Sequence, residues 1–79
     1  MRKRSLLLVE WEDTATYGSW RNEDKSSEAK PMICQTVGWK MKASSARKVA
    51  IASTRNSVGE CSDMTVIPRV NIKSVRRLE

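Results

Sequence analysis

Lysine and arginine are the candidate functional side chains of this 79-residue chain, because their cationic groups can bind anions. They number 15 against 9 acidic residues, which gives a formal net charge of +6 and a pI near 9.8. The excess is local, because residues 1–30 carry six basic and six acidic side chains whereas residues 31–79 carry nine basic and three acidic. Such a concentration of cations predicts a salt-dependent attraction to phosphate groups.

The basic residues of the C-terminal part fall into two groups. Lys40 and Lys42 share one face of a predicted strand, and Arg47 and Lys48 follow across a short turn. Because neighbouring strands lie about 4.8 Å apart, we expect these four charges within about 10 Å of one another. The second group follows Pro68. The alternative to an anion-binding site is that these basic residues form a solvated face that binds no ligand. The anion-binding surface that we predict, for nucleic acid or a nucleotide, consists of Lys40, Lys42, Arg47, Lys48, Arg69, Lys73, Arg76 and Arg77.

Catalytic side chains are few. The sequence contains no histidine, which removes His-based triads, His-centred zinc sites and the usual general base near neutral pH. Glu10 and Glu12 share strand parity beside Asp13, but no second acidic cluster converges on them, so a solvated strand end is preferred to a magnesium site. Cys34 has no histidine to activate it as a nucleophile. We therefore predict a protein that is not an enzyme and that holds no metal or cofactor.

The cysteines and the first nine residues bear on the cellular compartment. Cys34 and Cys61 are too few for a metal cage, and we expect free thiols of a reducing cytoplasm, with a disulfide between them as the alternative. Residues 1–9 imitate a signal peptide, but their apolar run is shorter than the usual ~7–15 residues. No stretch approaches the ~20 apolar residues of a membrane span. The sequence predicts a soluble, cytoplasmic protein with no membrane partner.

The tryptophans are the remaining candidates for contact with a partner. By strand alternation Trp39 shares a face with Ile33, so we expect both Trp11 and Trp39 in the core, where a small domain gains most from large side chains. Trp20 lies in a polar stretch of the chain. It either packs that stretch against the body or, with Tyr17, forms an exposed anchor for a partner protein.

The elements that must position these residues are short strands. A 3₁₀-like turn is expected after Pro68, and Gly38 indicates a bulge or a sharp bend. A helix is the alternative for the third segment, which is rich in alanine, and for the last. Residues 12–30 have little apolar periodicity and are expected to form a long, mobile loop. The predicted strands are residues 6–11, 32–42, 47–54, 64–67 and 70–78.

Five short strands with a bend and a proline-marked turn are typical of a small, highly curved barrel. We predict an all-β protein in which residues 1–79 form one five-stranded SH3-like or Sm-like barrel. Closure of the barrel would remove the exposed edges that an open five-stranded sheet leaves. Oligomerisation through edge strands stays open, as does the identity of any ligand.

Three segments carry a resemblance to a known group. They are V-E-W-E-D at 9–13 with Trp20 downstream, T-V-G-W at 36–39, and V-I-P-x-x-x-I-K-S-V-R-R-L at 66–78. Together they resemble a group of small accessory proteins carried by bacteriophages and prophages. The resemblance implies an SH3-like barrel and an accessory role in the cytoplasm of an infected or lysogenic bacterium, without supplying an activity.

These observations favour a non-catalytic, phage-type binding module that engages nucleic acid or a nucleotide through its basic hairpin. One alternative is an inhibitor that binds a host protein or defence complex through residues 12–30 and Trp20. A second alternative is a homo-oligomer in which basic clusters from two copies enclose and sequester a nucleotide signal.

Overall fold

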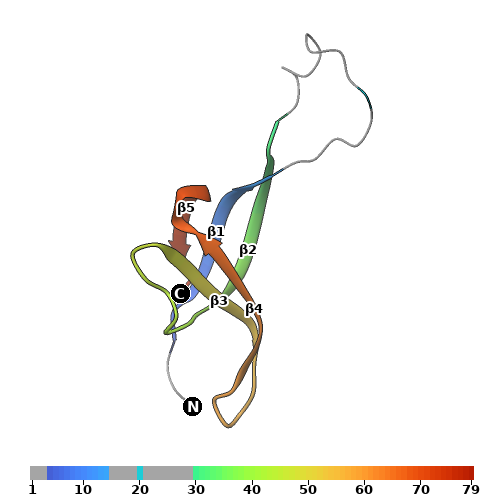
Figure 1. Cartoon of the computed structure of the whole chain (residues 1–79). Helices are drawn as coiled ribbons and strands as arrows, with labels where there is room; N and C mark the ends of the chain where they lie inside the picture. Colours follow the sequence, from blue (N-terminus) through green and yellow to red (C-terminus); the bar gives the residue numbers. More distant parts are fainter. Residues whose placement is uncertain (1–3, 15–19, 21–29) are drawn as a thin grey trace.

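The protein is a small all-β structure built around five strands. The computed structural model describes residues 4–14, 20 and 30–79. It confirms the all-β class, the strand assigned to the alanine-rich third segment, and the 3₁₀ turn before the last strand. The elements are β1 (Leu6–Asp13), β2 (Met32–Lys40), β3 (Lys48–Arg55), β4 (Cys61–Pro68), the 3₁₀ helix η1 (Arg69–Asn71) and β5 (Ile72–Arg77) (Figure 1).

Several strand boundaries differ from the sequence prediction by one to three residues. β4 begins at Cys61, three residues before the expected start at Met64, because its first residues pair with the end of β3 despite their polarity. β1 continues to Asp13, so the first residues assigned to the long loop belong to a strand. The rest of that predicted loop, apart from residues 14, 20 and 30, lies outside the described residues.

The strands form one antiparallel sheet in the order β4-β3-β2-β1-β5. β4 and β5 therefore end the sheet on opposite sides. Among the described residues no ladder joins these two strands, so the sheet is open and closure into a barrel is not seen.

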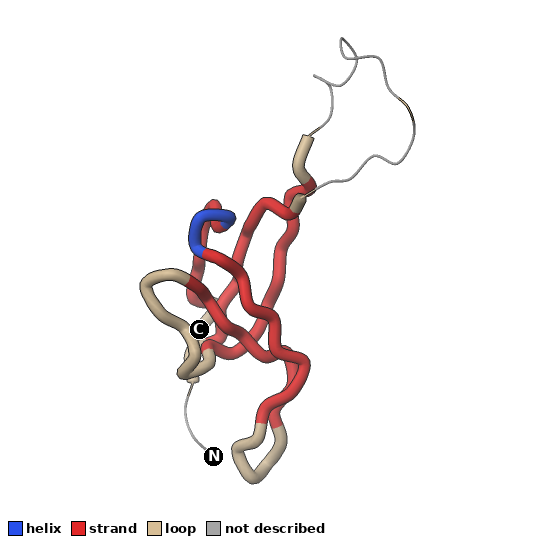
Figure 2. Tube along the Cα trace, viewed as in Figure 1, coloured by secondary structure: helices blue, strands red, loops and turns tan. Residues whose placement is uncertain are grey.

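The sheet divides into two layers that cross each other. β1 pairs with β2 over its full length, but β2 pairs with β3 at Trp39 and Lys40 alone. The β3–β4 hairpin consequently runs obliquely across β1 and β2 (Figures 1 and 2). A Cβ atom on Gly38 would lie 2.8 Å from the carbonyl oxygen of Ala52, which crosses at this point. The register of β1 with β2 runs through Gly38 without a shift, so this glycine permits a close approach of β3 and marks no bulge.

The hydrophobic core fills the space between the two layers. Its buried members come from β1, β3 and β4, and Trp11 and Ile72 pack against them. Burying one such side chain stabilises the fold by about 1.5–3 kcal/mol relative to its exposed state. Trp11, which is expected in the core, is half-buried and packs against it, and its indole Nε1–H donates to Thr36 Oγ1 at 2.9 Å. The buried core residues are Leu7, Val9, Val49, Ile51 and Ile67.

The prediction that Trp39 belongs to the core is wrong. Alternation along β2 correctly separates two faces, but the face with Gly38 is the one that β3 covers. Ile33 and Val37, on the face of Trp39, are 51% and 46% exposed. Trp39 is half-buried on this outer face, because the guanidinium of Arg55 lies over its ring, 4.4 Å from the ring centroid.

Candidate anion-binding surface

Three of the predicted cations come together where η1 meets the segment between β2 and β3. The backbone N–H of Arg69 donates to the carbonyl of Arg47 at 2.9 Å, and Lys48 is the direct strand partner of Pro68. The Nε–H of Arg69 also donates to the carbonyl of Ser45 at 2.9 Å. We call Arg47, Lys48 and Arg69 the turn cluster. Sequence reasoning had assigned Arg69 to a different basic group from Arg47 and Lys48.

Serine side chains hold the backbone under the turn cluster in place. The hydroxyl of Ser44 accepts the N–H of Ala50 at 2.9 Å and donates to the carbonyl of Ala50 at 3.1 Å. Ser45 contributes twice, since its N–H donates to the carbonyl of Lys48 and its hydroxyl accepts the N–H of Arg47. Serine satisfies backbone groups in this way in many turns. The turn cluster thus stands on an ordered backbone, although its side chains are exposed.

Lys40, Arg76 and Arg77 lie at the start of β1, on its two sides. The N–H of Lys40 donates to the carbonyl of Ser5 at 2.8 Å, and the carbonyl of Lys40 accepts from Arg4 Nη1 at 3.2 Å. On the other side, Arg76 and Arg77 are the strand partners of Leu8 and Leu7 in β1. We call Arg4, Lys40, Arg76 and Arg77 the strand-end group.

Lys42 follows Lys40 and precedes Arg47 along the chain. It occupies the turn after β2 that is closed by the N–H of Ser44 donating to the carbonyl of Met41 at 3.0 Å. Its side chain is exposed. The structure therefore places seven of the eight predicted anion-binding residues on the turn cluster, this turn and the strand-end group. Arg4 is a further cation that the prediction did not include.

Lys73 is the predicted residue that the structure does not bring to the others. The register of β1 with β5 shifts between Glu10 and Trp11, which leaves Lys73 without a direct strand partner. Its ammonium lies 3.5 Å from Glu12 Oε1, and both side chains are about half exposed. Such a pair contributes roughly 0–1 kcal/mol. Lys73 thus neutralises an acidic strand end, because the bulge turns it toward Glu12.

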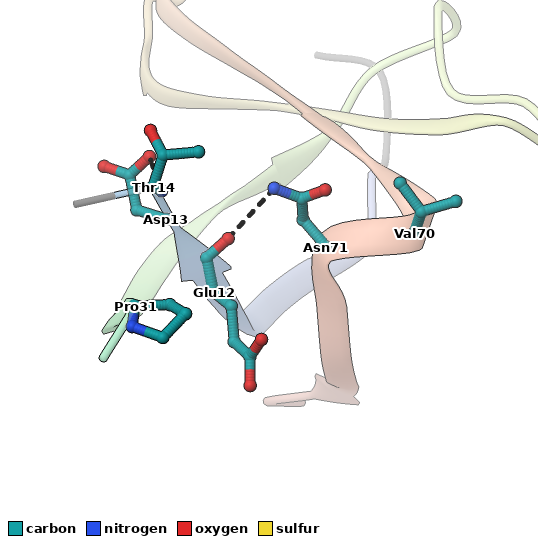
Figure 3. A pocket seen from close by; sticks show the side chains of 6 residues that line it. All are labelled: Glu12, Asp13, Thr14, Pro31, Val70 and Asn71. Carbon is teal, nitrogen blue, oxygen red and sulfur yellow. Dashed lines mark hydrogen bonds between the residues drawn. The ribbon is translucent and has the colours of Figure 1, made fainter. Parts of the chain in front are cut away.

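That strand end borders a pocket of about 170 Å³, shown in Figure 3. The side-chain amide of Asn71 donates to the carbonyl of Glu12 at 3.0 Å, and the N–H of Thr14 donates to Asp13 Oδ1 at 2.8 Å. Two carboxylates at its rim make the pocket unsuitable for an anion. Over the residues that the structure describes, no three His, Cys, Asp or Glu side chains converge in a way that could hold a metal ion. The lining residues are Glu12, Asp13, Thr14, Pro31, Val70 and Asn71.

Among the described residues, no acidic side chain forms an ion pair with the turn cluster. Between described residues, the ion pair of Lys73 with Glu12 is the one that forms, and it lies at the end of β1. No described carboxylate pairs with Arg47, Lys48 or Arg69. A cluster of exposed cations without acidic partners is suited to phosphate groups, which accept hydrogen bonds from guanidinium and ammonium groups.

The aromatic and sulfur-containing side chains provide fewer candidates for contact with a ligand. Trp20 is fully exposed, so it does not pack against the body, and Tyr17 lies outside the described residues. Cys34 and Cys61 are free, half-buried thiols, as expected. Arg55, which sequence reasoning did not select, covers the ring of Trp39. No sequence signal pointed to this contact, because it depends on how β3 bends away from β2.

Comparisons with known proteins add no family to this description. No protein-family model, no curated protein and no solved structure matches the chain. A search of the described residues found no helix long and apolar enough to cross a lipid bilayer.

Proposed function

We propose that the protein is a non-catalytic binding module that engages the phosphates of a nucleic acid or nucleotide through the turn cluster. One observation carries the proposal: the hydrogen bond from the N–H of Arg69 to the carbonyl of Arg47 joins η1 to the β2–β3 segment. It brings the backbone positions of three cations together, and no described carboxylate forms an ion pair with them. Lys42 and the strand-end group extend the positive surface.

Recognition is expected to depend on phosphates more than on bases. Single-strand binders that tolerate any sequence usually stack bases on exposed aromatic rings. Here Trp11 packs against the core and Arg55 covers Trp39, and the exposed Trp20 lies on the segment between β1 and β2, which is not part of the turn cluster. Phosphate contacts position a nucleic acid without selecting its sequence, and they weaken steeply as salt is added. We therefore expect binding with little sequence preference and strong salt dependence.

The fold that we propose for this module is an SH3-like barrel. Four strands in antiparallel succession, followed by a single 3₁₀ turn that returns β5 to the free side of β1, support this proposal. The crossing of two layers over one small core supports it as well. The accessory role in an infected bacterium rests on the resemblance of residues 9–13, 36–39 and 66–78 to phage proteins.

A titration with labelled single-stranded and duplex DNA tests the proposed function. Lys48→Gln removes a charge of the turn cluster and should weaken binding roughly fivefold at low salt. Lys73→Gln is the matched control, because it removes the same charge at the acidic strand end, where the ammonium faces Glu12. Binding that is absent at low salt, or equal losses for the two variants, would contradict the proposal.

A second candidate function rests on the complete exposure of Trp20. Tryptophan is enriched among the residues that dominate binding energy at protein interfaces. An exposed Trp20 would anchor the protein on a host protein or defence complex. Pull-down from nuclease-treated host lysate, with Trp20→Ala as the comparison, tests this function. Retention of the same partner by Trp20→Ala would exclude an anchoring role for this side chain.

A further inference from the structure

β2 has a free edge along most of its length. The strand pairs with β1 from Met32 to Trp39, whereas its other side meets β3 at Trp39 and Lys40. Within the described part of the chain no strand pairs with that side of residues 32–38. This strand lies inside the sheet order, yet it presents an edge to solvent because β3 crosses it at Gly38.

The hydrogen-bonding groups on this free edge follow from the strand's alternation. The N–H of Lys40 donates toward β1, to Ser5, and the N–H of Met41 donates toward β3, to Ala50. Odd-numbered residues of β2 therefore direct their N–H and C=O away from β1. Ile33, Gln35 and Val37 thus present unpaired backbone groups at the free edge. The Ile33 and Val37 side chains are about half exposed on the outer face.

The other two edges of the sheet carry features that discourage pairing. On β4, Asp63 has a φ of 57°, which interrupts the strand geometry, and Pro68 ends the strand. On β5, the unpaired Lys73 and two arginines place positive charge along the edge. Charges, irregular backbone and prolines are the usual protections of edge strands. Residues 32–38 of β2 contain no charged residue and no proline, and their register is uninterrupted.

We propose that this edge pairs with the same edge of a second copy of the protein. The pairing is antiparallel and two-fold symmetric, with Gln35 opposite Gln35 of the second copy. Ile33 of each copy then lies opposite Val37 of the other copy. In this register every N–H and C=O group that Ile33, Gln35 and Val37 direct away from β1 forms a hydrogen bond with the second copy. A shift of the register by two residues in one direction places Val37 opposite Pro31, which has no N–H to donate. A shift by two residues in the other direction places Ile33 opposite Trp39, whose backbone is already paired with Ala52. Either shift therefore loses hydrogen bonds.

Charge complementarity also favours this arrangement. The β1–β2 hairpin is positive at the start of β1, where Arg4 and Lys40 lie. At the end of β1, Lys73 pairs with Glu12, whereas the carboxylate of Asp13 forms no ion pair with a described side chain. An antiparallel pair sets the positive end of each copy beside the end of the other copy that carries the Asp13 carboxylate. A parallel pair would place like charges together. A second copy therefore fits the edge in both hydrogen bonding and charge.

The solution mass of the full chain, measured by sedimentation over a range of concentrations, tests the proposal first. A concentration-dependent dimer is expected, and a monomer at the highest attainable concentration would overturn it. Gln35→Pro removes an N–H that bonds to nothing within the described chain, and edge strands tolerate proline where the N–H faces solvent. This variant should raise the dimer dissociation constant at least about tenfold, because two central hydrogen bonds are lost. Gln35→Thr keeps the N–H and should dimerise normally. A dimer that is unaffected by Gln35→Pro would overturn the proposal.

A disulfide experiment tests the register without relying on a proline. In the proposed pairing, Cys34 lies opposite Thr36 of the second copy as a non-hydrogen-bonded pair, in which the Cα atoms are about 4.5 Å apart and within disulfide range. Thr36→Cys in a Cys61→Ser background should therefore form a covalent dimer under mild oxidation. Cys61→Ser alone should stay largely uncrosslinked, and equal crosslinking of the two proteins would overturn the register. The turn cluster is unchanged in all of these variants, so DNA binding can fail or survive independently of dimerisation.

Discussion

The crossing of β1 with β3 and the turn cluster are held together in different ways. At the crossing, Val9 and Ile51 are at most 1% exposed, and they pack against apolar neighbours from three strands. In the turn cluster the side chains of Arg47 and Lys48 are exposed, and hydrogen bonds of the backbone and of the Ser44 and Ser45 hydroxyls hold the chain that carries them. The difference separates the residues that stabilise the fold from those to which we assign the proposed function. Substitutions at the crossing should lower the free energy of unfolding, and substitutions in the turn cluster should leave the stability of the fold nearly unchanged.

The largest effect on stability is expected from Ile51→Ala. The side chain is 1% exposed at the centre of the core, so truncation leaves a cavity between the layers. We expect a loss of about 3 kcal/mol in the free energy of unfolding, within the range measured for buried isoleucines. Urea unfolding followed by tryptophan fluorescence measures this. A loss below about 1 kcal/mol would show that the two layers do not pack as described.

Gly38→Ala should destabilise the protein by about 2 kcal/mol, because the added methyl group meets the backbone at the crossing. Its Cβ would lie 2.8 Å from the Ala52 carbonyl oxygen and 3.1 Å from Ile51 Cβ. Gly59→Ala is the control. Gly59 has a φ of 89° but open space around it, so alanine there should cost only about 1 kcal/mol through backbone strain. The same unfolding experiment compares them, and a larger loss for Gly59→Ala would contradict the close approach at Gly38.

Arg55→Gln should have a smaller effect, about 0.5–1 kcal/mol, because it removes the cation over the ring of Trp39. Tryptophan fluorescence should also change, since the indole of Trp39 becomes more accessible to solvent. Iodide quenching measures this accessibility. Unchanged quenching would show that Arg55 does not cover the ring in solution.

The smallest effect on stability is expected from Lys48→Gln, which should lie within about 0.5 kcal/mol of the unsubstituted protein. The lysine side chain is exposed and forms no ion pair with a described acid. Thermal unfolding followed by circular dichroism checks this. If the variant were strongly destabilised, a loss of DNA binding could not be assigned to the missing charge, and the separation of stability from function would fail.

Much of the strand pattern could be predicted from the sequence because short apolar runs alternate with turn residues. Pro68 and the uneven apolar spacing after it correctly indicated the 3₁₀ turn. The start of β4 was missed because its first residues are mostly polar and are strand only through pairing with β3. The buried face of β2 was misassigned, since alternation defines two faces without saying which one is covered. Gly38 was the available signal, because a small residue leaves room for a crossing strand.

The basic surface could be predicted in part. Arg47 and Lys48 were recognised as neighbours because they adjoin one turn. Arg69 was separated from them, since its side chain reaches a carbonyl 24 residues earlier in the chain. Lys73 was included because charge was counted without the strand register, and the shift between β1 and β5 that turns it toward Glu12 has no local sequence signal. Long-range contacts of this kind require the packed structure.

The salt dependence of single-stranded DNA binding tests the proposed role of the turn cluster most directly. For single strands, each phosphate that a cation neutralises contributes about −0.7 to the slope of the logarithm of the association constant against the logarithm of salt concentration. The double substitution Arg47→Gln and Lys48→Gln should make this slope shallower by about 1.4, because two such contacts are lost. The fold should remain intact by circular dichroism. An unchanged slope, or no binding by the unsubstituted protein at low salt, would contradict the proposed role.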